Sequence, residues 1–502
     1  MQRDLNLRSI DDLAVVREIR DPVYNYVHLS NFEDKVLDSW IFQRLDRIAQ
    51  MPTAHLVYPG GKYSRKSHSL GVMHLMGKAI LHILFLHSEE LREEISPLLL
   101  GESVVLKNRN EKFDDLLDPE IKNNWWKSKE LDELVQYARL AALLHDIGHA
   151  PFSHTFEAAT EELVENGTID YAFDHEEMSR RIVKEKEDQL GLEEPFKADE
   201  INEILDKRGG SAPDFLKGLI DGPCDCDKLD YLMRDSYHLG TPEYGKVDAE
   251  RIIDGFRVKD LQIHISSSAL HAMMNSFRAI QSMYTAIYYH KTSRAFDFMI
   301  VDALSLVPEF ITEITSSVNR FLEYDDCTIV CAIEEKARGE DSSAKPYKKA
   351  NEILEKVRKR KKTYEHILEF PLNFPLVAEE AIKTDINRVC KRIKELCEEH
   401  DAEDFNIRLD YRSAIKPIGI NLGEIIKWLT SPIIYDTEDN EVKSLNEIYN
   451  AYYRELTRYS IIFRIFVNRE KFKKHPSTVK KIKEEAKKEL ENLDTRWRTA
   501  SS

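Results

Sequence analysis

The stretch that most constrains the fold is residues 140–157, LAALLHDIGHAPFSHTFE. A run with helical apolar spacing begins at Leu131, and Gly148 predicts where that helix has ended. The end of this helix and the turn after it carry three histidines and two carboxylates. His145 and Asp146 therefore lie at a helix end, where adjacent His and Asp side chains can offer a nitrogen and an oxygen to a metal ion. The neighbouring imidazoles suit phosphate binding and proton transfer.

A His-Asp pair alone has little weight, because a chain with 17 histidines contains such pairs by chance. A second pair, His400-Asp401, lies in the polar run CEEHDAED. The first pair gains meaning from His68, in the first turn of another predicted helix, and from Asp227. Two imidazoles and two carboxylates leave coordination positions open, as a catalytic metal requires, and suit Mn, Fe or Zn better than Ca.

Size and charge exclude several classes of protein. With 502 residues the chain is too long for one ordinary core, so we expect two or more lobes. Its net charge of −17 argues against a nucleic-acid coat or a membrane-surface binder, and an anionic substrate would need positive charge local to a pocket. Six cysteines without a CxxC pair indicate reduced thiols. The apolar runs are far shorter than the roughly 20 residues of a membrane span, so we expect a cytoplasmic protein with no membrane partner.

Apolar periodicity predicts a mostly α-helical protein. Helices are expected over 32–50, 66–86, 131–144, 227–238 and, as one or two, 267–304, after short strands within 1–35. Asp174 is a predicted N-cap that places His175 in a first helical turn. Residues 101–130 read as an inserted loop. Beyond about residue 310 we expect a smaller α+β lobe, with a small sheet near 406–427 and a hairpin turning near Asp439-Asn440.

Several longer stretches carry a family resemblance. They are RDPVYNYVHL, FQRLDRIAQMPTAHLVYPG, SRKSHSLGVMHL, LLHDIGHAPFSHTFE, DHEEMS, DCDKLDYLMRDSYHLG and AIYYHKTSRAFDFMIVDA. Together they resemble the HD-domain phosphohydrolases, whose pattern is H…HD…D, and within them the dNTP triphosphohydrolase branch. The resemblance implies an HD-domain helical core over 1–310, with 101–130 inserted, and a C-terminal helical lobe with a small antiparallel sheet over 311–502.

The resemblance also implies a metal at His68, His145, Asp146 and Asp227. The expected cofactor is a divalent transition metal (Mn, Fe or Zn), with or without Mg beside it. The family further implies a nucleotide substrate, a symmetric homo-oligomer (dimer or tetramer) and a nucleotide activator. The implied reaction is attack of water at the α-phosphorus of a dNTP, which yields a deoxynucleoside and triphosphate.

Roles for the phosphate side follow by position. Arg65 matches an arginine that grips substrate phosphate beside the first metal ligand. His149, His154 and His175 match histidines that line the phosphates, and His154 is the candidate to protonate the leaving 5′-oxygen. Glu157 stands where relatives usually have Asp, so it supports this proton transfer with an altered geometry.

Roles for the sugar side follow in the same way. Lys228 matches a phosphate-binding lysine, and Tyr231 a tyrosine that packs on the sugar and disfavours a ribose 2′-hydroxyl. Asp235 matches an acid that binds the 3′-hydroxyl, and Gln50 a residue that also reaches the sugar. Tyr288 is retained at the position of a substrate-contacting tyrosine.

The chain also departs from the pattern. Ile280 replaces a phosphate-contacting Arg, for which Arg278 is the possible substitute, while Tyr284 replaces a His and Tyr289 a Gln that contacts the base. These changes leave substrate length and base preference open.

At the expected activator site Asp38 and Gln43 match, but Asp46 replaces a basic residue. Two other functions stay open: hydrolysis of another nucleotide or a nucleic acid, and nucleotide sensing with vestigial catalysis. The intact ligand set favours an enzyme, and the acidic charge disfavours a nuclease.

Overall fold

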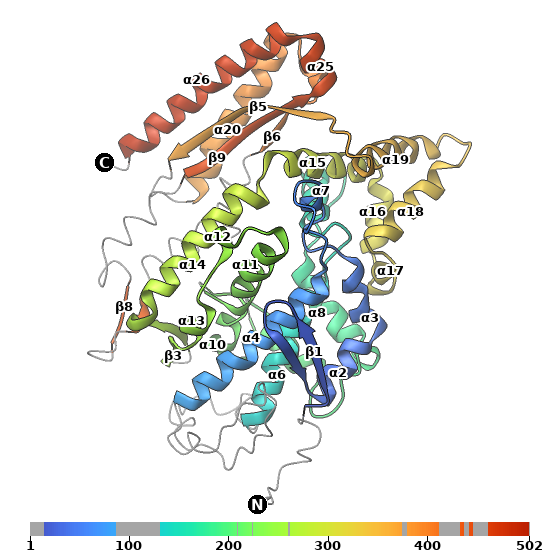
Figure 1. Cartoon of the computed structure of the whole chain (residues 1–502). Helices are drawn as coiled ribbons and strands as arrows, with labels where there is room; N and C mark the ends of the chain where they lie inside the picture. Colours follow the sequence, from blue (N-terminus) through green and yellow to red (C-terminus); the bar gives the residue numbers. More distant parts are fainter. Residues whose placement is uncertain are drawn as a thin grey trace, which may run out of the picture.

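The computed structural model describes residues 15–86, 131–207, 209–222, 224–259, 262–373, 379–410, 432–435, 441–444 and 460–500. Across these residues the protein is mostly α-helical with three small sheets, which confirms the predicted fold class (Figure 1). The predicted inserted loop at 101–130 lies outside the described residues. Within the described part of the chain, no helix is both long and apolar enough to cross a lipid bilayer.

An antiparallel hairpin begins the described chain, where β1 (Arg17–Asp21) pairs with β2 (Asn25–Leu29). Helix α2 (Asn31–Asp38) follows it and starts with a capping box. The Ser30 hydroxyl accepts from the Glu33 backbone N–H, and the Glu33 carboxylate accepts from the Ser30 backbone N–H.

The single helix predicted over 32–50 is wrong, because Ser39 interrupts it. Ser39 is extended (ψ 140°), and its hydroxyl accepts a hydrogen bond that caps the next helix, α3 (Trp40–Gln43). The 3-10 turn η1 (Arg44–Arg47) then continues the chain. Serine competes well as an N-cap, and this local preference outweighs the apolar periodicity.

Two long helices form the centre of the core. Helix α4 (Arg65–Leu86) packs against α6 (Leu131–Leu144), and both lie within one residue of their predicted bounds. Helix α11 (Cys226–Leu239) also packs against α4 (Figure 1). Asp225 caps the start of α11, and Gly240 ends it in the left-handed region (φ 69°).

Helices α7 (His154–Glu165) and α8 (His175–Glu185) follow the turn after α6. The predicted cap is confirmed, since the Asp174 carboxylate accepts from the N–H groups of Glu176 and Glu177. Gly148 lies directly on α8. A Cβ there would be 2.2 Å from the Ser179 backbone nitrogen, so a glycine is needed for the turn to reach this helix.

The segment predicted as one or two helices contains two. Helix α14 (Leu270–Met283) runs into a π-helical turn, η8 (Tyr284–Tyr288), before α15 (Lys291–Ser305) begins. The His290 side chain caps α15 by accepting from the Thr292 backbone N–H. Single π-turns occur often at functional sites.

The C-terminal part contains a three-stranded antiparallel sheet in the order β5-β9-β6, with β5 at Tyr364–Asn373, β6 at Arg408–Asp410 and β9 at Ser460–Asn468. Helices α20 (Glu379–Glu399) and α26 (Pro476–Ala500) pack together beside it (Figure 1). The predicted hairpin is present as β7 (Pro432–Tyr435) with β8 (Val442–Ser444). Its turn and residues 411–431 lie outside the described residues.

The hairpin also joins the third sheet, in the order β3 (Phe256–Lys259), β4 (Gln262–Ser266), β7 and β8. Strand β7 pairs in parallel with β4, which belongs to the first part of the chain. The division at residue 310 therefore stays a prediction.

Other elements connect these parts. They are η2 (Ala54–Leu56), η6 (Asp188–Leu190), α9 (Ala198–Leu205), α10 (Asp214–Gly218), α12 (Pro242–Gly245), α13 (Ala249–Ile253), β3 (Phe256–Lys259), η7 (Ser267–Ala269), α16 (Pro308–Thr315), α17 (Val318–Leu322), α18 (Asp326–Ala337), α19 (Ala344–Arg358), η9 (Glu403–Phe405) and α25 (Arg469–Lys474).

Two arginines tie strand β6 to the helical core. Arg408 of β6 donates to Glu162 of α7 (2.5 Å) and to Asp302 of α15. In the other direction, Arg294 of α15 forms two hydrogen bonds to Asp410 of β6 (3.1 and 3.2 Å). The helix that begins with His154 is thus ion-paired to the C-terminal sheet.

Candidate active site

Four side chains from distant parts of the sequence meet where three helix ends converge. His68 lies in the first turn of α4 and Asp227 in the first turn of α11, while His145 and Asp146 directly follow α6. His68 Nε2 is 3.0 Å from Asp227 Oδ1 and 3.7 Å from Asp146 Oδ2. His145 Nε2 is 3.3 Å from Asp146 Oδ1 and 4.0 Å from Asp227 Oδ1. The structure brings together all four predicted metal ligands.

Both imidazoles are oriented so that Nε2 faces this cluster. The Nδ1–H of His145 donates to the Ala142 carbonyl, and that of His68 donates to the Asp230 carboxylate (both 2.8 Å). Metal-ligating histidines commonly have their second nitrogen held in this way. His145 Nε2 is buried and has no hydrogen-bond partner among the described residues. Because a buried polar atom without a partner costs free energy, the donor set fits a divalent transition metal.

The charges of the cluster also fit a metal. Burial opposes the ionisation of Asp146, but His145, Arg65 and His149 outweigh it and hold the pKa of Asp146 well below its usual range. Burial lowers the pKa of His68, but hydrogen bonds with Asp227 and Asp230 outweigh it and raise this pKa to about 10. Metal binding is therefore expected to release a proton from His68.

A second group, of three imidazoles, lies beside the first. Ligand atoms of His149, His154 and His175 all lie within 4.8 Å of one another. The His149 ring stacks on His175 (centroids 4.0 Å apart, planes at 16°) and meets His154 edge-on (5.0 Å). Glu157 accepts from Nδ1 of His154 (2.6 Å) and of His175 (2.5 Å). Both Nε2 atoms therefore remain for contact with a substrate.

Glu157 sets the protonation of this group. Burial raises its pKa, but the two imidazoles outweigh burial and hold the pKa of Glu157 well below its usual range. Burial lowers the pKa of His175, and the negative charge of Glu157 outweighs this, so the pKa of His175 is raised. The protonated form of His175 is favoured where substrate phosphate is expected.

Arg65 links the two groups. Its guanidinium donates to Asp146 Oδ2 (2.5 Å) and to the Ser153 hydroxyl (2.9 Å), and its side chain is buried. The carbonyl of His149 is held by another buried arginine, Arg44 (2.9 Å). A buried cation thus contacts a predicted metal ligand and the residue that precedes His154.

Tyrosines surround Asp235, the predicted sugar-binding acid. The hydroxyls of Tyr63 and Tyr288 donate to its two carboxylate oxygens, the latter at 2.6 Å. Burial raises the pKa of Asp235 to about 6, although these hydrogen bonds oppose it. The Tyr231 ring lies 6.2 Å from Tyr288, and Tyr284 lies 4.7 Å from Tyr288. A sugar hydroxyl bound here would share the carboxylate oxygens of Asp235 with the hydroxyls of Tyr63 and Tyr288.

Lys228 and Gln50 differ in whether their polar groups already have a hydrogen-bond partner. The Lys228 ammonium donates to the buried Asp225 carboxylate (2.6 Å), which also caps α11. Gln50 Oε1 is buried and lacks a hydrogen-bond partner within the described residues. Gln50 therefore keeps an acceptor for a hydroxyl group, as its predicted role requires.

The departures at 280–289 have a clear structural basis. Ile280 is buried in the core, so this position offers no polar group. Arg278 is exposed and donates to Asn275 (2.8 Å). Residues two apart on a helix point in nearly opposite directions, so Arg278 does not substitute at position 280. The Tyr284 ring contacts the rings of Tyr288 and Tyr289, so it belongs to the group of tyrosines beside Asp235.

At the expected activator site, polar side chains are paired within the chain. Asp38 accepts two hydrogen bonds from Arg17, Gln43 accepts from Lys66, and Asp46 accepts from Ser64. The activator and the homo-oligomer stay predictions.

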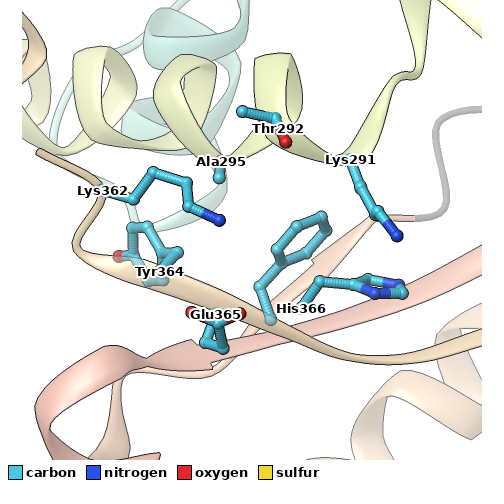
Figure 2. Close-up of a pocket in the computed structure, with 8 residues that line it drawn as sticks. Lys291, Thr292, Ala295, Lys362, Tyr364, Glu365 and His366 are labelled. Atoms are coloured by element: carbon cyan, nitrogen blue, oxygen red, sulfur yellow. The ribbon is translucent and has the colours of Figure 1, made fainter. Parts of the chain in front are cut away.

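A separate hollow lies between α15 and the β5–β9 sheet (Figure 2). It is lined by Lys291, Thr292, Ala295, Lys362, Tyr364, Glu365, His366 and Phe466. None of the residues predicted to bind metal or substrate lines it, so the hollow is not part of the candidate active site.

Comparison with known families matches two segments. The HD domain matches residues 119–214, which include the His145-Asp146 pair and the three imidazoles. The HD associated region matches residues 247–361. These matches show an HD domain and an HD associated region in the chain, which supports the HD-domain phosphohydrolase family. His68 and Asp227, the other two predicted metal ligands, lie outside both matched segments.

Individual relatives agree with this assignment. The chain is 28% identical over 351 residues to the deoxynucleoside triphosphate triphosphohydrolase SAMHD1 homolog of Dictyostelium discoideum, covering 68% of this chain and 58% of that one. Human SAMHD1 is 27% identical over 331 residues, covering 60% and 46%. The uncharacterized protein YwfO of Bacillus subtilis is 29% identical over 299 residues, covering 58% and 56%. The chain thus spans about half the length of these relatives.

Solved structures share the fold. A hypothetical protein from Aquifex aeolicus superposes with a TM-score of 0.59 at 22% identity, covering 92% of this chain and 99% of that one. A phosphohydrolase from Bacteroides thetaiotaomicron gives 0.57 at 22% identity, covering 90% and 99%.

Two residues that support the HD site were not predicted from the sequence. Asp230 orients His68 and also pairs with Arg234 (2.9 Å), and its spacing of three from Asp227 was the available signal. Tyr63 donates to Asp235 and stacks on His238 (4.2 Å). No periodic pattern marks Tyr63, because its partners lie more than 170 residues away.

Replacing Glu157 by Gln is expected to shift the pH dependence of the hydrolysis predicted for this site. The raised pKa of His175 should fall without the carboxylate, so the protonated imidazole is lost at lower pH. The alkaline limb of kcat/KM should move down by about one unit or more, and kcat should fall about 10²-fold. Glu165→Gln, at an exposed position of the same helix, should leave both unchanged. An unmoved alkaline limb in Glu157→Gln would contradict the role of Glu157.

Proposed function

We propose that this protein hydrolyses deoxynucleoside triphosphates to a deoxynucleoside and triphosphate, with water attacking the α-phosphorus. One observation carries the proposal: Asp146 faces both groups of histidines. Its Oδ1 lies 3.3 Å from His145 Nε2 and 3.3 Å from His149 Nε2. A reacting phosphate at this point would contact the metal cluster and the imidazoles together. The names of the relatives from Dictyostelium discoideum and human support the same reaction.

Phosphate binding follows from local charge in an acidic protein. His68, His145, Asp146 and Asp227 would hold the metal, which supplies Lewis-acid polarisation of a phosphoryl oxygen and eases deprotonation of water when bound. Arg65 and protonated His175 would offset the charge of the polyphosphate. Lys228 would add a charge that Asp225 already balances in part.

The leaving group needs a proton, and His154 can deliver it. Its side chain is 64% exposed, whereas His149 is 1% exposed, so His154 is the imidazole that reaches a bound nucleotide. Glu157 holds Nδ1, which leaves Nε2 for the 5′-oxygen. As the bond from this oxygen to the α-phosphorus breaks, the oxygen takes the proton, and water oxygen forms the new bond to phosphorus.

The reaction is tested by incubating metal-loaded protein with dNTPs, NTPs, nucleoside monophosphates and single-stranded DNA, and resolving the products. We expect triphosphate and deoxynucleoside in equal amounts from dNTPs, and none from the metal-free protein. Orthophosphate or pyrophosphate alone would exclude cleavage of the bond between the α-phosphorus and the 5′-oxygen. Cleavage of monophosphates or DNA would favour another HD phosphohydrolase activity, and binding without turnover would favour a sensor.

A further inference from the structure

The turn between His149 and His154 is held in a conformation that its residues disfavour. Phe152 (φ 63°) and Ser153 (φ 51°) both have positive φ, although neither is glycine. Such conformations persist only where surrounding contacts impose them. Because Ser153 binds Arg65 and precedes His154, these contacts also determine where two proposed substrate-binding side chains lie.

The contact that imposes this turn comes from Asp326, the first residue of α18. One of its carboxylate oxygens accepts from the Phe152 backbone N–H (2.7 Å). The other accepts from the Ala49 backbone N–H (2.9 Å). The Ala49 carbonyl in turn accepts from the Ser153 hydroxyl (3.0 Å). One carboxylate thus fastens the turn to the segment that precedes Gln50.

A neighbouring residue, Arg44, holds the start of the turn at His149. Arg44 donates to the carbonyls of His149 (2.9 Å) and Tyr324 (2.7 Å) and lies over the Phe321 ring (4.5 Å). Burial lowers the pKa of Arg44, and the charge of Asp326 opposes this shift. Burial raises the pKa of Asp326 to about 6, although hydrogen bonds from backbone N–H groups and the charge of Arg44 oppose this shift. Residues 321–326 therefore form a fixed support behind the turn, outside the segment matched to the HD domain.

Capping does not explain Asp326. The neighbouring Asp325 is the N-cap of α18, accepting from the N–H groups of Cys327 and Thr328 and pairing with Arg47 (2.6 Å). The two adjacent carboxylates thus have different partners. Asp325 accepts from N–H groups of its own helix, whereas both oxygens of Asp326 accept from backbone N–H groups that are distant in the sequence.

We propose that Asp326 is a positioning residue of the active site. It fixes the turn at 149–154 and through it the places of His154 and of Ser153, the partner of Arg65. This rests on the proposed hydrolysis for its catalytic consequence, but the effect on the turn is independent of it.

The test compares Asp326→Asn with Asp325→Asn, which make the same change one residue apart. The amide in Asp326→Asn has one acceptor oxygen, so only one of the two N–H groups can remain bonded. Hydrogen exchange of a peptide spanning 149–156 should rise at least about tenfold. The kcat should fall about 10²-fold, with KM and metal content within about twofold of wild type. Asp325→Asn keeps a capping side chain and should change none of these.

Asp326→Ser, whose hydroxyl also suits a first helical turn, is the second variant and should behave like Asp326→Asn. Wild-type exchange over 149–156 in a folded Asp326 variant would overturn the proposal, as would equal effects from Asp325→Asn. If the wild-type protein hydrolyses no nucleotide, the proposed function fails, and the exchange data still decide whether Asp326 holds the turn.

Discussion

Asp227→Asn is expected to remove stoichiometric metal and to lower turnover by about 10²–10³-fold. The Asp227 carboxylate lies 3.0 Å from His68 Nε2 and 4.0 Å from His145 Nε2, and a neutral amide is a poorer ligand for a divalent cation. The substitution keeps the volume of the side chain, so little repacking is needed. Metal content by mass spectrometry and steady-state rates check this expectation.

The second His-Asp pair in the sequence provides the control. His400 bonds Glu485 (3.1 Å), and Asp401 has φ 50°, a conformation that asparagine also tolerates. Asp401→Asn should therefore keep wild-type metal content and turnover. Addition of metal should raise the melting temperature of wild type and of Asp401→Asn, but not of Asp227→Asn. Full metal content and turnover in Asp227→Asn would remove Asp227 from the ligand set.

Gly148→Ala is expected to separate the imidazoles without touching any of them. A Cβ at this position would lie 2.2 Å from the Ser179 nitrogen and 2.3 Å from the His175 carbonyl oxygen. Both atoms belong to the backbone of α8, so the helix must move, and His175 moves with it. Turnover should fall about 10²-fold, and the free energy of unfolding should fall by about 1–3 kcal/mol.

Gly339→Ala is the matched control for this change. The nearest atom to its added Cβ is 3.2 Å away on the Ala344 methyl group, at an exposed position. Its free energy of unfolding should stay within about 0.5 kcal/mol of wild type. If Gly148→Ala were as stable and as active as Gly339→Ala, the close packing of the turn on α8 would not matter for the site.

Helices and their ends were the predictable part of this protein. The bounds of α4 and α6 follow from apolar spacing, and the start of α8 follows from the Asp174 cap, which are local signals. The candidate site could be assembled from the sequence because its residues sit at these ends. The spacing of His145, His149 and His154 then placed both groups of histidines near one another.

What could not be predicted depends on contacts between distant residues. Asp326 bonds Phe152 across 174 positions, and nothing in its own helix requires that contact. The parallel pairing of β4 with β7 likewise cannot be predicted from local sequence patterns, because the two strands are far apart in the chain. At Ser39 two local signals conflicted, and the cap prevailed over the periodicity.

The ion pairs of strand β6 bear on how short a working version of this protein can be. The matched HD segments end at residue 361, before β6 begins. A chain cut there would keep Arg294, Glu162 and Asp302 but lose Asp410 and Arg408, their partners. Of these pairs, the one between Arg294 and Asp410 is buried. Losing one member of a buried ion pair costs about 3–5 kcal/mol, and domains are stable by only about 5–15 kcal/mol. The smallest cooperative folding unit therefore extends past the segments by which the family is recognised.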